Sequence, residues 1–239
     1  MIDGHAAAPT SGRGHLDVVR LPGLTPYLPM WERQQWLAAA RQRNEIDDLF
    51  LLLEHPHVYT NGRSGQRAHL LVDEATLARR GACYLEVDRG GGLTYHGPGQ
   101  LVGYAMIDLA RAGVGVRAYV RGLEQVLMRT AAHFGVEATT SPGYTGVWVG
   151  DEKLAAIGVR VRRGVTYHGF ALNVDPDLSC FEAIVPCGIS DRGVTSLACL
   201  VGHHVMTAEV ATVCVEEFAG VFELALRWRA SIPSPDCAG

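Results

Sequence analysis

One stretch decides the predicted fold, Arg89-Gly90-Gly91-Gly92-Leu93-Thr94-Tyr95-His96-Gly97-Pro98-Gly99-Gln100. It follows an expected strand, Cys83–Val87, and precedes another, Leu101–Ile107. Its five glycines in twelve residues are typical of a loop whose backbone bends sharply and approaches another group closely. The arginine, tyrosine and histidine among the glycines suit contact with a ligand. We therefore predict a binding loop between two strands, with a long glycine-rich hairpin that binds nothing as the alternative.

The stretch does not match the common phosphate-binding motifs. No Gly-Lys-Ser/Thr follows the glycines, which excludes a Walker A sequence. A dinucleotide fingerprint is excluded as well, because a strand rather than a helix is expected next.

The composition limits the class of protein. A chain of 239 residues that is 48% hydrophobic can form one large domain or two small ones. The formal net charge of -4 argues against nucleic acid as the main partner. No apolar run approaches the roughly 20 residues that span a bilayer, so we expect no membrane insertion. Residues 1–15 lack the apolar core of a secretory signal and are expected to be a disordered tail, which favours a cytoplasmic location.

Hydrophobic periodicity predicts a single α/β domain, residues 16–230, with a mixed β-sheet flanked by helices. No linker divides the chain, and residues 231–239 are expected to fray as a C-terminal tail. A polar loop with a strand-like middle is expected over 54–63, and a long loop over 175–192. The expected strands are Leu16–Leu21, Leu49–Leu53, Cys83–Val87, Leu101–Ile107, Gly146–Gly150, Leu154–Val161 and Val165–Val174. The expected helices run from Pro29 to about Arg43, from an Asp73 cap to Arg80, over 116–134, from a Thr195 cap to Leu200, and over 210–222.

Lysine is almost absent from this chain. Of the 21 lysines and arginines, only Lys153 is a lysine. Surface positions accept arginine as readily, so a lysine kept in such a chain indicates a task that arginine cannot perform. That task is to release a proton near neutral pH.

Six cysteines are present, and in a cytosolic chain free thiols are expected rather than three disulfides. No CxxC pair indicates a zinc site. His55 and His57 have no third ligand nearby and are expected to be loop histidines. The thiols in predicted strands and helices are expected to be small core residues. Cys187, between Pro186 and Gly188 in a loop, is the best candidate nucleophile.

A nucleophilic thiol needs a partner that removes its proton. His96, His168 and Lys153 are the candidates, and the residues alone do not choose among them. The histidines belong to an internal echo, since Thr94-Tyr95-His96-Gly97 recurs as Thr166-Tyr167-His168-Gly169. This echo is either a coincidence or the mark of two loops that face one ligand.

Four motifs together resemble the lipoyl(octanoyl) transferase family, LipB. They lie in the family's order between about Leu49 and the last helix, and they are the glycine-rich stretch, Lys153-Leu154-Ala155-Ala156-Ile157-Gly158, His168-Gly169-Phe170-Ala171-Leu172-Asn173 and Pro186-Cys187-Gly188-Ile189. The resemblance implies the catalytic-domain fold of biotin and lipoate protein ligases, which is related to class II aminoacyl-tRNA synthetases.

The resemblance also implies an activity. The enzyme would take octanoyl from octanoyl-acyl carrier protein and give it to a lysine of a lipoyl domain, in lipoate biosynthesis. The acceptors would be 2-oxoacid dehydrogenase complexes and the glycine cleavage H protein. Cys187 would carry the acyl thioester, and Lys153 would lower the pKa of that thiol and move protons, with no cofactor and no metal. The residues implied to bind substrate are Arg89, Gly90, Gly91, Gly92, Leu93, Thr94, Tyr95, His96, Ala156, Ile157, Gly158, His168, Gly169, Phe170 and Ala171.

Three other functions stay open at this point. An ATP-dependent lipoate or biotin ligase is the nearest, and Cys187 would be dispensable in it. A cysteine hydrolase would pair Cys187 with His96 or His168. A third reading is a non-catalytic protein that binds a carrier or lipoyl domain. In the transferase reading, surface arginines would meet the acidic carrier protein, and the candidates are Arg63, Arg160, Arg162 and Arg163.

Overall fold

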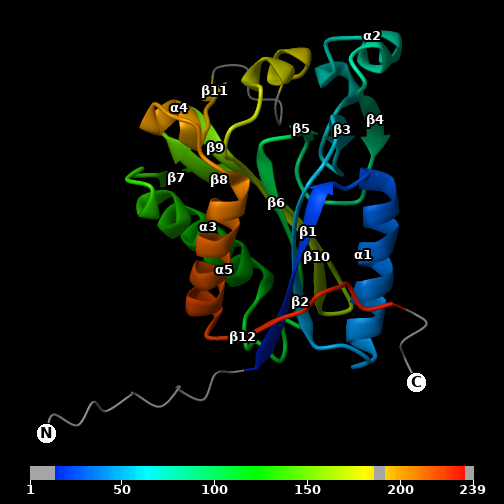
Figure 1. Ribbon diagram of the computed structural model, residues 1–239. Helices are drawn as coiled ribbons and strands as arrows, with labels where there is room; N and C mark the ends of the chain where they lie inside the picture. Colours follow the sequence, from blue (N-terminus) through cyan, green and yellow to red (C-terminus); the bar gives the residue numbers. More distant parts are fainter. Residues whose placement is uncertain (1–13, 186–191, 235–239) are drawn as a thin grey trace, which may run out of the picture.

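A mixed β-sheet runs through the protein and separates two layers of helices (Figure 1). The structure is a computed structural model that describes residues 14–185 and 192–234. Within these residues the sheet has nine strands in the order β12-β1-β2-β6-β10-β9-β8-β7, and β11 pairs with β9. In chain order its strands are β1 (His15–Leu24), β2 (Asp48–Glu54), β6 (Gln100–Met106), β7 (Thr139–Ser141), β8 (Tyr144–Val149), β9 (Glu152–Arg162), β10 (Val165–Asn173), β11 (Gly193–Val194) and β12 (Ala225–Trp228).

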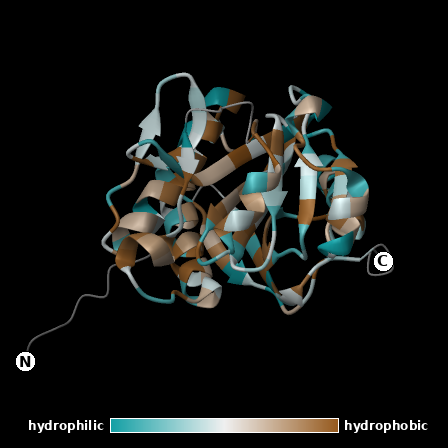
Figure 2. Cartoon of the chain, turned by 90° about the horizontal axis from the view of Figure 1, so that it is seen from above, coloured by the Kyte–Doolittle hydropathy of each residue, from teal (hydrophilic) through white to brown (hydrophobic). Residues whose placement is uncertain are grey.

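The helices cover the two faces of this sheet unequally (Figure 1). Helix α1 (Tyr27–Gln42) packs on one face, while α3 (Val116–His133) and α5 (Thr207–Phe222) pack together on the other. The shorter helices are α2 (Glu74–Arg79), α4 (Leu197–Val201) and the 3-10 turns η1 (Arg67–His69) and η2 (Leu178–Ala183). In the view from above, hydrophobic stretches run through the middle of the molecule (Figure 2). The expected fold class, a mixed sheet flanked by helices, is confirmed.

Strand β2 shows why the core has two halves. Successive side chains of a strand point to opposite faces. Leu49, Leu51 and Leu53 therefore pack on the α1 side, and Phe50 and Leu52 pack on the α3 and α5 side. All five are buried, as the continuous apolar run predicted.

A second, three-stranded sheet corrects the loop prediction for the glycine-rich stretch. Leu93–His96 forms strand β5, which pairs antiparallel with β3 (Val58–Asn61), and β4 (Cys83–Glu86) pairs with β3 on its other side. The four residues of β5 are buried. The local glycine content predicted a loop here. The edge of β3 is free to pair, however, so residues 93–96 form a strand against it.

Other local expectations need smaller corrections. Ser196, not Thr195, caps α4, because the Ser196 hydroxyl accepts the Cys199 N–H at 3.2 Å. Asp73 caps α2 as predicted. Cys83 and Cys199 are exposed rather than core residues, whereas Cys214 is buried. Three short strands were not predicted, namely β7, β11 and β12.

Both terminal tails are shorter than predicted, because residues assigned to them make contacts with the domain. His15, the last residue of the expected N-terminal tail, already pairs with Ala225 in β1. At the other end, Ile232 packs against the α1 half of the core, and Arg33 donates to the Pro233 carbonyl at 2.5 Å. Cys237 lies outside the described residues.

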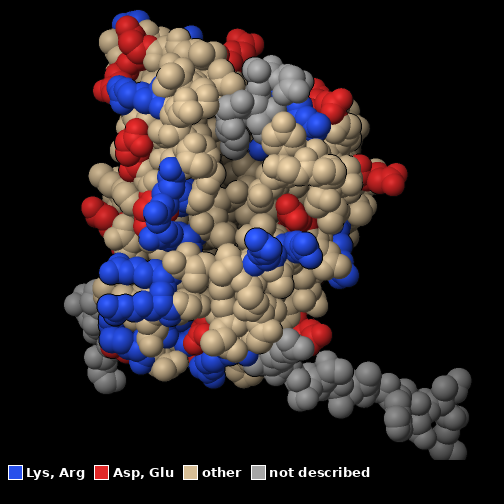
Figure 3. All heavy atoms as spheres, turned by 180° about the vertical axis from the view of Figure 1, so that it is seen from behind, with Lys and Arg blue, Asp and Glu red and all other residues tan. Residues whose placement is uncertain are grey.

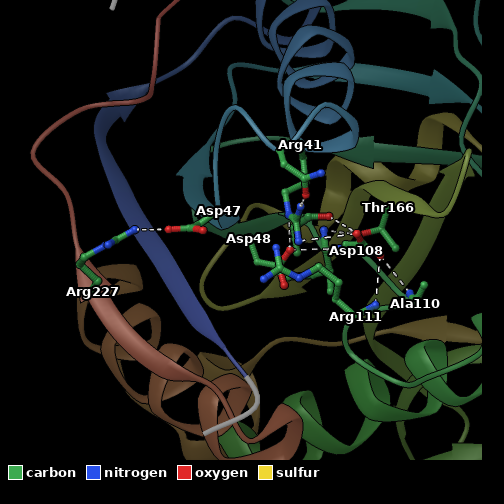
Figure 4. A network of polar contacts seen from close by, with 11 residues as sticks. Arg41, Asp47, Asp48, Asp108, Ala110, Arg111, Thr166 and Arg227 are labelled. Carbon is green, nitrogen blue, oxygen red and sulfur yellow. Dashed lines mark hydrogen bonds and ion pairs between the residues drawn. The ribbon is translucent and has the colours of Figure 1, made fainter. Parts of the chain in front are cut away.

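A buried ion pair joins the end of α1 to the sheet (Figure 4). Arg41, which is 2% exposed, donates to the Asp48 carboxylate at 2.6 Å. The Asp108 N–H donates to the same carboxylate at 3.1 Å, and the Asp108 side chain lies 3.7 Å from Arg41. Burial raises the pKa of Asp48, and the two donors oppose that rise. Nearby, Arg227 pairs with Asp47 on the surface (Figure 4).

His55 lies in the loop between β2 and β3, as predicted, and it is buried there. Its Nδ1–H donates to the Thr25 carbonyl at 2.5 Å, so its Nε2 accepts from the Tyr104 hydroxyl at 2.7 Å. Burial lowers the pKa of His55 to about 4. The described residues contain no group of three or more side chains suited to hold a metal ion. Among them no helix is long and apolar enough to cross a membrane.

The Arg41–Asp48 pair should be important for stability. We expect Arg41→Gln to lower the free energy of unfolding by about 3–5 kcal/mol, because it leaves the Asp48 charge buried without its partner. Denaturant unfolding at neutral pH measures this loss. The matched control is Arg43→Gln, which removes an arginine paired with Glu45 on the exposed surface and should change little. Equal effects of the two substitutions would contradict the role given to burial.

The buried histidine should make stability depend on pH. Between pH 6.5 and about 4 the unfolded chain binds a proton at His55 before the folded protein does, so stability falls as the pH falls. The loss reaches on the order of 3 kcal/mol at the acid end of this range. Unfolding free energies measured across it should fall less steeply in His55→Gln than in the wild type. The exposed His203→Gln variant should keep the wild-type slope, and a wild-type slope in His55→Gln would refute the assignment.

Candidate functional site

The main cavity lies beside β9 and β10, at the start of α1. It is open to solvent at its mouth, and the space between its walls, counted together with the solvent at the mouth, is about 470 Å³. It is lined by Tyr27, Arg89, Gly91, Thr94, His96, Tyr104, Thr145, Lys153, Ala156, Ile157, Gly158, His168, Gly169, Phe170 and Ala171.

Two cross-strand pairs of small residues form one wall of the main cavity. Ala156 pairs with Ala171, and Gly158 pairs with Gly169, in the antiparallel register of β9 and β10. Side chains in register on neighbouring strands lie on the same face of the sheet. Because none of the four extends beyond Cβ, this wall leaves space that larger residues would fill.

The glycine-rich segment passes directly over that wall. The Gly90 N–H donates to the Val159 carbonyl at 3.0 Å, and a Cβ on Gly158 would lie 2.7 Å from the Gly90 carbonyl oxygen. Two backbones can approach this closely only where side chains are absent. The sequence expectation that the glycines permit a close approach is therefore met at Gly158 and Gly90.

Arg89 links the glycine-rich segment to the three-stranded sheet by hydrogen bonds. It is buried, and its Nη2 donates to the Thr60 carbonyl at 2.5 Å while Nη1 donates to the Gly90 carbonyl at 3.0 Å. These bonds order the backbone that covers the main cavity. Arg89 also lines the cavity, as expected for a substrate-binding residue.

Strand β5 divides the remaining predicted residues between two sides. Thr94 and His96 line the main cavity, whereas Leu93 and Tyr95 pack in a separate hydrophobic cluster with Tyr59. This division follows from the alternation of side chains along a strand. Gly90 and Gly92 do not line the main cavity either, although their neighbour Gly91 does.

A chain of hydrogen bonds joins two of the sequence motifs to the backbone at Thr195. His96 Nδ1–H donates to Gln100 Oε1 at 3.2 Å, and Gln100 Nε2 donates to Asn173 Oδ1 at 2.9 Å. Asn173 Nδ2 then donates to the Thr195 carbonyl at 2.9 Å. Burial, with a smaller contribution from His55, holds the pKa of His96 well below its usual value. His96 is therefore neutral and held in one orientation.

Lys153 stands where the main cavity meets a second, smaller hollow. The side chain is 7% exposed, and its Nζ lies 4.7 Å from the centre of the Trp148 ring. The smaller hollow shares Thr94, Lys153, Ala156 and Ala171 with the main cavity, and it is completed by Gln100, Asn173, Phe181 and Val194.

The candidate nucleophile Cys187 lies outside the described residues. Its surroundings along the chain are ordered on both sides. Val185 N–H donates to the His69 carbonyl at 2.8 Å, and Val194 pairs in register with Lys153. Val194, the partner of Lys153, follows Cys187 by seven residues in the sequence, 194 minus 187.

Asp88 is a site residue that the sequence analysis missed. Its Oδ1 accepts hydrogen bonds from Trp31 Nε1 and His168 Nε2, each at 3.0 Å, and its Oδ2 accepts from the Tyr167 hydroxyl. Arg160 lies 3.9 Å away. Burial works to raise the pKa of Asp88, but the hydrogen bonds from His168, Tyr167 and Trp31 hold it well below the usual range. Its position directly before the glycine-rich stretch was the available signal.

His168 adopts a backbone conformation that is unusual for a residue with a side chain. Its φ is 57°, and its N–H donates to Gln34 Oε1 of α1 at 2.8 Å instead of to β6. This turn lets Tyr167 and His168, neighbours in the chain, both reach Asp88. Burial lowers the pKa of His168, against the effect of Asp88. The neutral imidazole donates from Nε2, which leaves Nδ1 as an acceptor.

The internal echo corresponds to one shared site. His96 and His168 both line the main cavity, but they extend from strands β5 and β10 rather than from two loops. Tyr27, Tyr104 and Thr145 line it too and were not predicted. Tyr104 lies in an expected strand and Tyr27 just before an expected helix, and nothing in either pattern distinguishes them from packing residues.

The four arginines suggested for a carrier protein do not share one environment. Arg160 is half-buried beside Asp88, whereas Arg63, Arg162 and Arg163 are exposed. Arg162 and Arg163 line a surface groove with Arg43, between α1 and the β9–β10 turn. Basic side chains gather on the rear face of the molecule (Figure 3).

Solved structures share this fold. Lipoate-protein ligase A bound with ATP superimposes with a TM-score of 0.68 and 17% identity, over 92% of this chain and 89% of that one. A bi-partite lipoate protein ligase from Thermoplasma acidophilum gives a TM-score of 0.66 and 18% identity, over 92% and 87%. Biotin protein ligase from Aquifex aeolicus in complex with biotin and ATP gives 0.52 and 13%, over 86% and 70%. The fold is thus the ligase catalytic-domain fold that the resemblance implied.

Sequence relatives are more similar. The octanoyltransferase of Chloroflexus aggregans is 47% identical over 214 residues, which is 88% of this chain and 93% of the relative. The octanoyltransferase of Solibacter usitatus is 47% identical over 214 residues, covering 90% and 96%. A family model for the lipoyl protein ligase A/B catalytic domain matches residues 26–219. On this evidence the chain belongs to the lipoyl protein ligase A/B catalytic-domain family.

Proposed function

We propose that this protein transfers an octanoyl group to a protein lysine through a thioester on Cys187, with Lys153 moving the protons. The relatives named octanoyltransferase support the reaction. The observation that supports the site is the placement of Lys153 at the junction of two hollows, one of which is walled by small residues.

The first step is attack on the donor thioester. The Cys187 thiolate adds to the octanoyl carbonyl, the bond from that carbon to the donor sulfur breaks, and the donor leaves as a thiol with one proton. An ammonium group close to Cys187 favours the thiolate over the thiol. Because a thioester is already activated, the step needs no ATP.

The second step moves the acyl group to the acceptor. A neutral lysine amine attacks the Cys187 thioester, an amide forms, and the cysteine leaves as a thiolate. The amine loses one proton in this step, and Lys153 is the group placed to accept it and return it to the leaving donor in the next cycle.

The main cavity suits the acyl chain. Each methylene buried there contributes about 0.8 kcal/mol, and the wall of Ala156, Gly158, Gly169 and Ala171 leaves the space. The donor in this proposal is octanoyl-acyl carrier protein, and the acceptors are lipoyl domains of 2-oxoacid dehydrogenase complexes and the glycine cleavage H protein. The exposed Arg162 and Arg163 are suited to meet an acidic carrier.

A cytoplasmic location is part of this proposal. The described cysteines, Cys83, Cys180, Cys199 and Cys214, are free thiols. Free thiols are usual where the compartment keeps cysteine reduced.

The acyl-enzyme can be observed directly. After mixing with octanoyl-acyl carrier protein, we expect the intact mass of the protein to increase by one octanoyl group, and peptide mapping to place it on Cys187. Cys187→Ser should give no thioester adduct. Cys180→Ser, which changes a half-buried cysteine preceding the same segment, should acylate like the wild type.

Three outcomes would each replace the proposal by a rival. Transfer by Cys187→Ser that depends on ATP and free octanoate would indicate a ligase. Release of octanoate in the presence of acceptor domain would indicate a hydrolase. Absence of any adduct would indicate a binding protein.

Lys153→Arg should lower transfer about 10²–10⁴-fold, the usual size of a general acid–base contribution. The positive charge remains, but a guanidinium does not release a proton near neutral pH. Single-turnover assays of acylation and deacylation measure the two steps separately. Arg192→Lys is the matched control, because Arg192 contacts the same Trp148 ring at 5.2 Å and should be replaceable. Normal turnover in Lys153→Arg would leave only an electrostatic role.

A further inference from the structure

The end of the main cavity away from Lys153 is closed by buried polar side chains. His168 is 1% exposed, Tyr104 3%, Tyr27 4% and His96 6%. Thr145 and Gly91, which also line the cavity, are exposed. The cavity is therefore open near Thr145 and Gly91, and we call the part of its wall that these four buried rings form the closed end.

The wall from Ala171 to His168 is about as long as an eight-carbon chain. Lys153 lines both hollows together with Ala156 and Ala171, and we take this pair as the start of the acyl path. From Ala171 to His168 is three residues along β10, or about 10 Å at the strand rise. An extended octanoyl chain has seven carbon–carbon bonds of about 1.5 Å, which in staggered form span roughly 9 Å.

His168 is held at this end by bonds outside the cavity. Its Nε2 donates to Asp88, its N–H donates to Gln34, and its ring lies edge-on to Tyr104 with centres 6.2 Å apart. Asp88 is itself fixed by Trp31 and Tyr167. Moving the His168 ring aside would break its hydrogen bond to Asp88 and its contact with Tyr104.

Two polar atoms at the closed end have no hydrogen-bond partner among the described residues. They are the Tyr27 hydroxyl and His168 Nδ1, and both are buried. The Tyr104 hydroxyl beside them is satisfied by His55. A methylene pressed against an unpartnered hydroxyl or imidazole nitrogen keeps that atom from water and offers no hydrogen bond in return.

We propose that His168 and Tyr27 determine acyl-chain length by ending the acyl site at about eight carbons. This inference rests on the proposed function, in which the chain extends from Lys153 along β9 and β10. A shorter chain leaves methylene contacts unused. A longer one must displace His168 from Asp88 or press against the two unpartnered polar atoms.

The test is the preference among hexanoyl-, octanoyl-, decanoyl- and dodecanoyl-acyl carrier protein, measured as kcat/KM for transfer. His168→Gly removes the ring and suits the positive φ, and we expect it to raise the decanoyl-to-octanoyl ratio about tenfold or more. Tyr27→Phe removes only the hydroxyl and should raise the same ratio by a smaller factor. Tyr119→Phe is the matched control, because Tyr119 also carries a buried, unpartnered hydroxyl but lies in α3, outside the cavity.

The outcomes separate the inference from the function on which it rests. If Tyr27→Phe and His168→Gly transfer octanoyl normally and keep the wild-type chain-length profile, the length-limiting role is overturned. The transferase proposal is then unaffected. Absence of acyl adduct in the wild type with every chain length overturns the proposed function instead. Should His168→Gly fail to fold by its thermal unfolding curve, the ratio in Tyr27→Phe decides alone. A changed ratio in Tyr119→Phe would also overturn the inference, since the effect would then not depend on the cavity.

Discussion

The close contact between two backbones, at Gly90 and Gly158, is the constraint on which the site depends. The Gly90 carbonyl oxygen lies so close to Gly158 that a Cβ on Gly158 would be 2.7 Å from it. Only a residue without a side chain permits this approach. This contact brings the glycine-rich segment across β9, and Arg89 fixes the same segment to Thr60 in the second sheet. The main cavity exists because the segment covers a wall of small residues instead of packing onto larger ones. Fold and site are thus determined by the same few glycines and alanines.

The cavity made in this way differs along its length. Near Lys153 the wall combines small apolar residues with the amides of Gln100 and Asn173, and the ammonium group lies over the Trp148 ring. At the other end His168 and Asp88 form a fixed polar pair, and His55 and Tyr104 form another. Each pair extends outward to α1 or to the loop before it, through Trp31 and Gln34 in one case and the Thr25 carbonyl in the other. Helix α1 therefore has two functions, since it covers the sheet and fixes the closed end of the cavity.

The sequence predicted much of this arrangement, and the failures have physical causes. A continuous apolar run located β2 and apolar residues at helical spacing located α3, because burial leaves a direct record in the chain. Strand β5 was missed because its partner edge on β3 is distant in sequence and glycines surround it. Lys153, His96 and His168 were recognised as site residues by type, whereas Asp88 and Tyr27 were not. Their roles depend on contacts between elements, namely His168 with Asp88 across 80 residues.

The fold by itself does not determine which reaction the site performs. Two ligases whose structures contain ATP share this fold, namely lipoate-protein ligase A at 17% identity and biotin protein ligase at 13%. A buried lysine beside an acyl cavity could serve either reaction, since an ammonium group stabilises a developing negative charge on an acyl-adenylate as well as a thiolate. The distinction must come from groups that only one reaction needs. The thiol that we propose at Cys187 is such a group, and the 47% identity to octanoyltransferases over most of the chain agrees with that choice. On this proposal a site closed by neutral histidines and tyrosines is sufficient, because a thioester brings no triphosphate charge that has to be neutralised at that end.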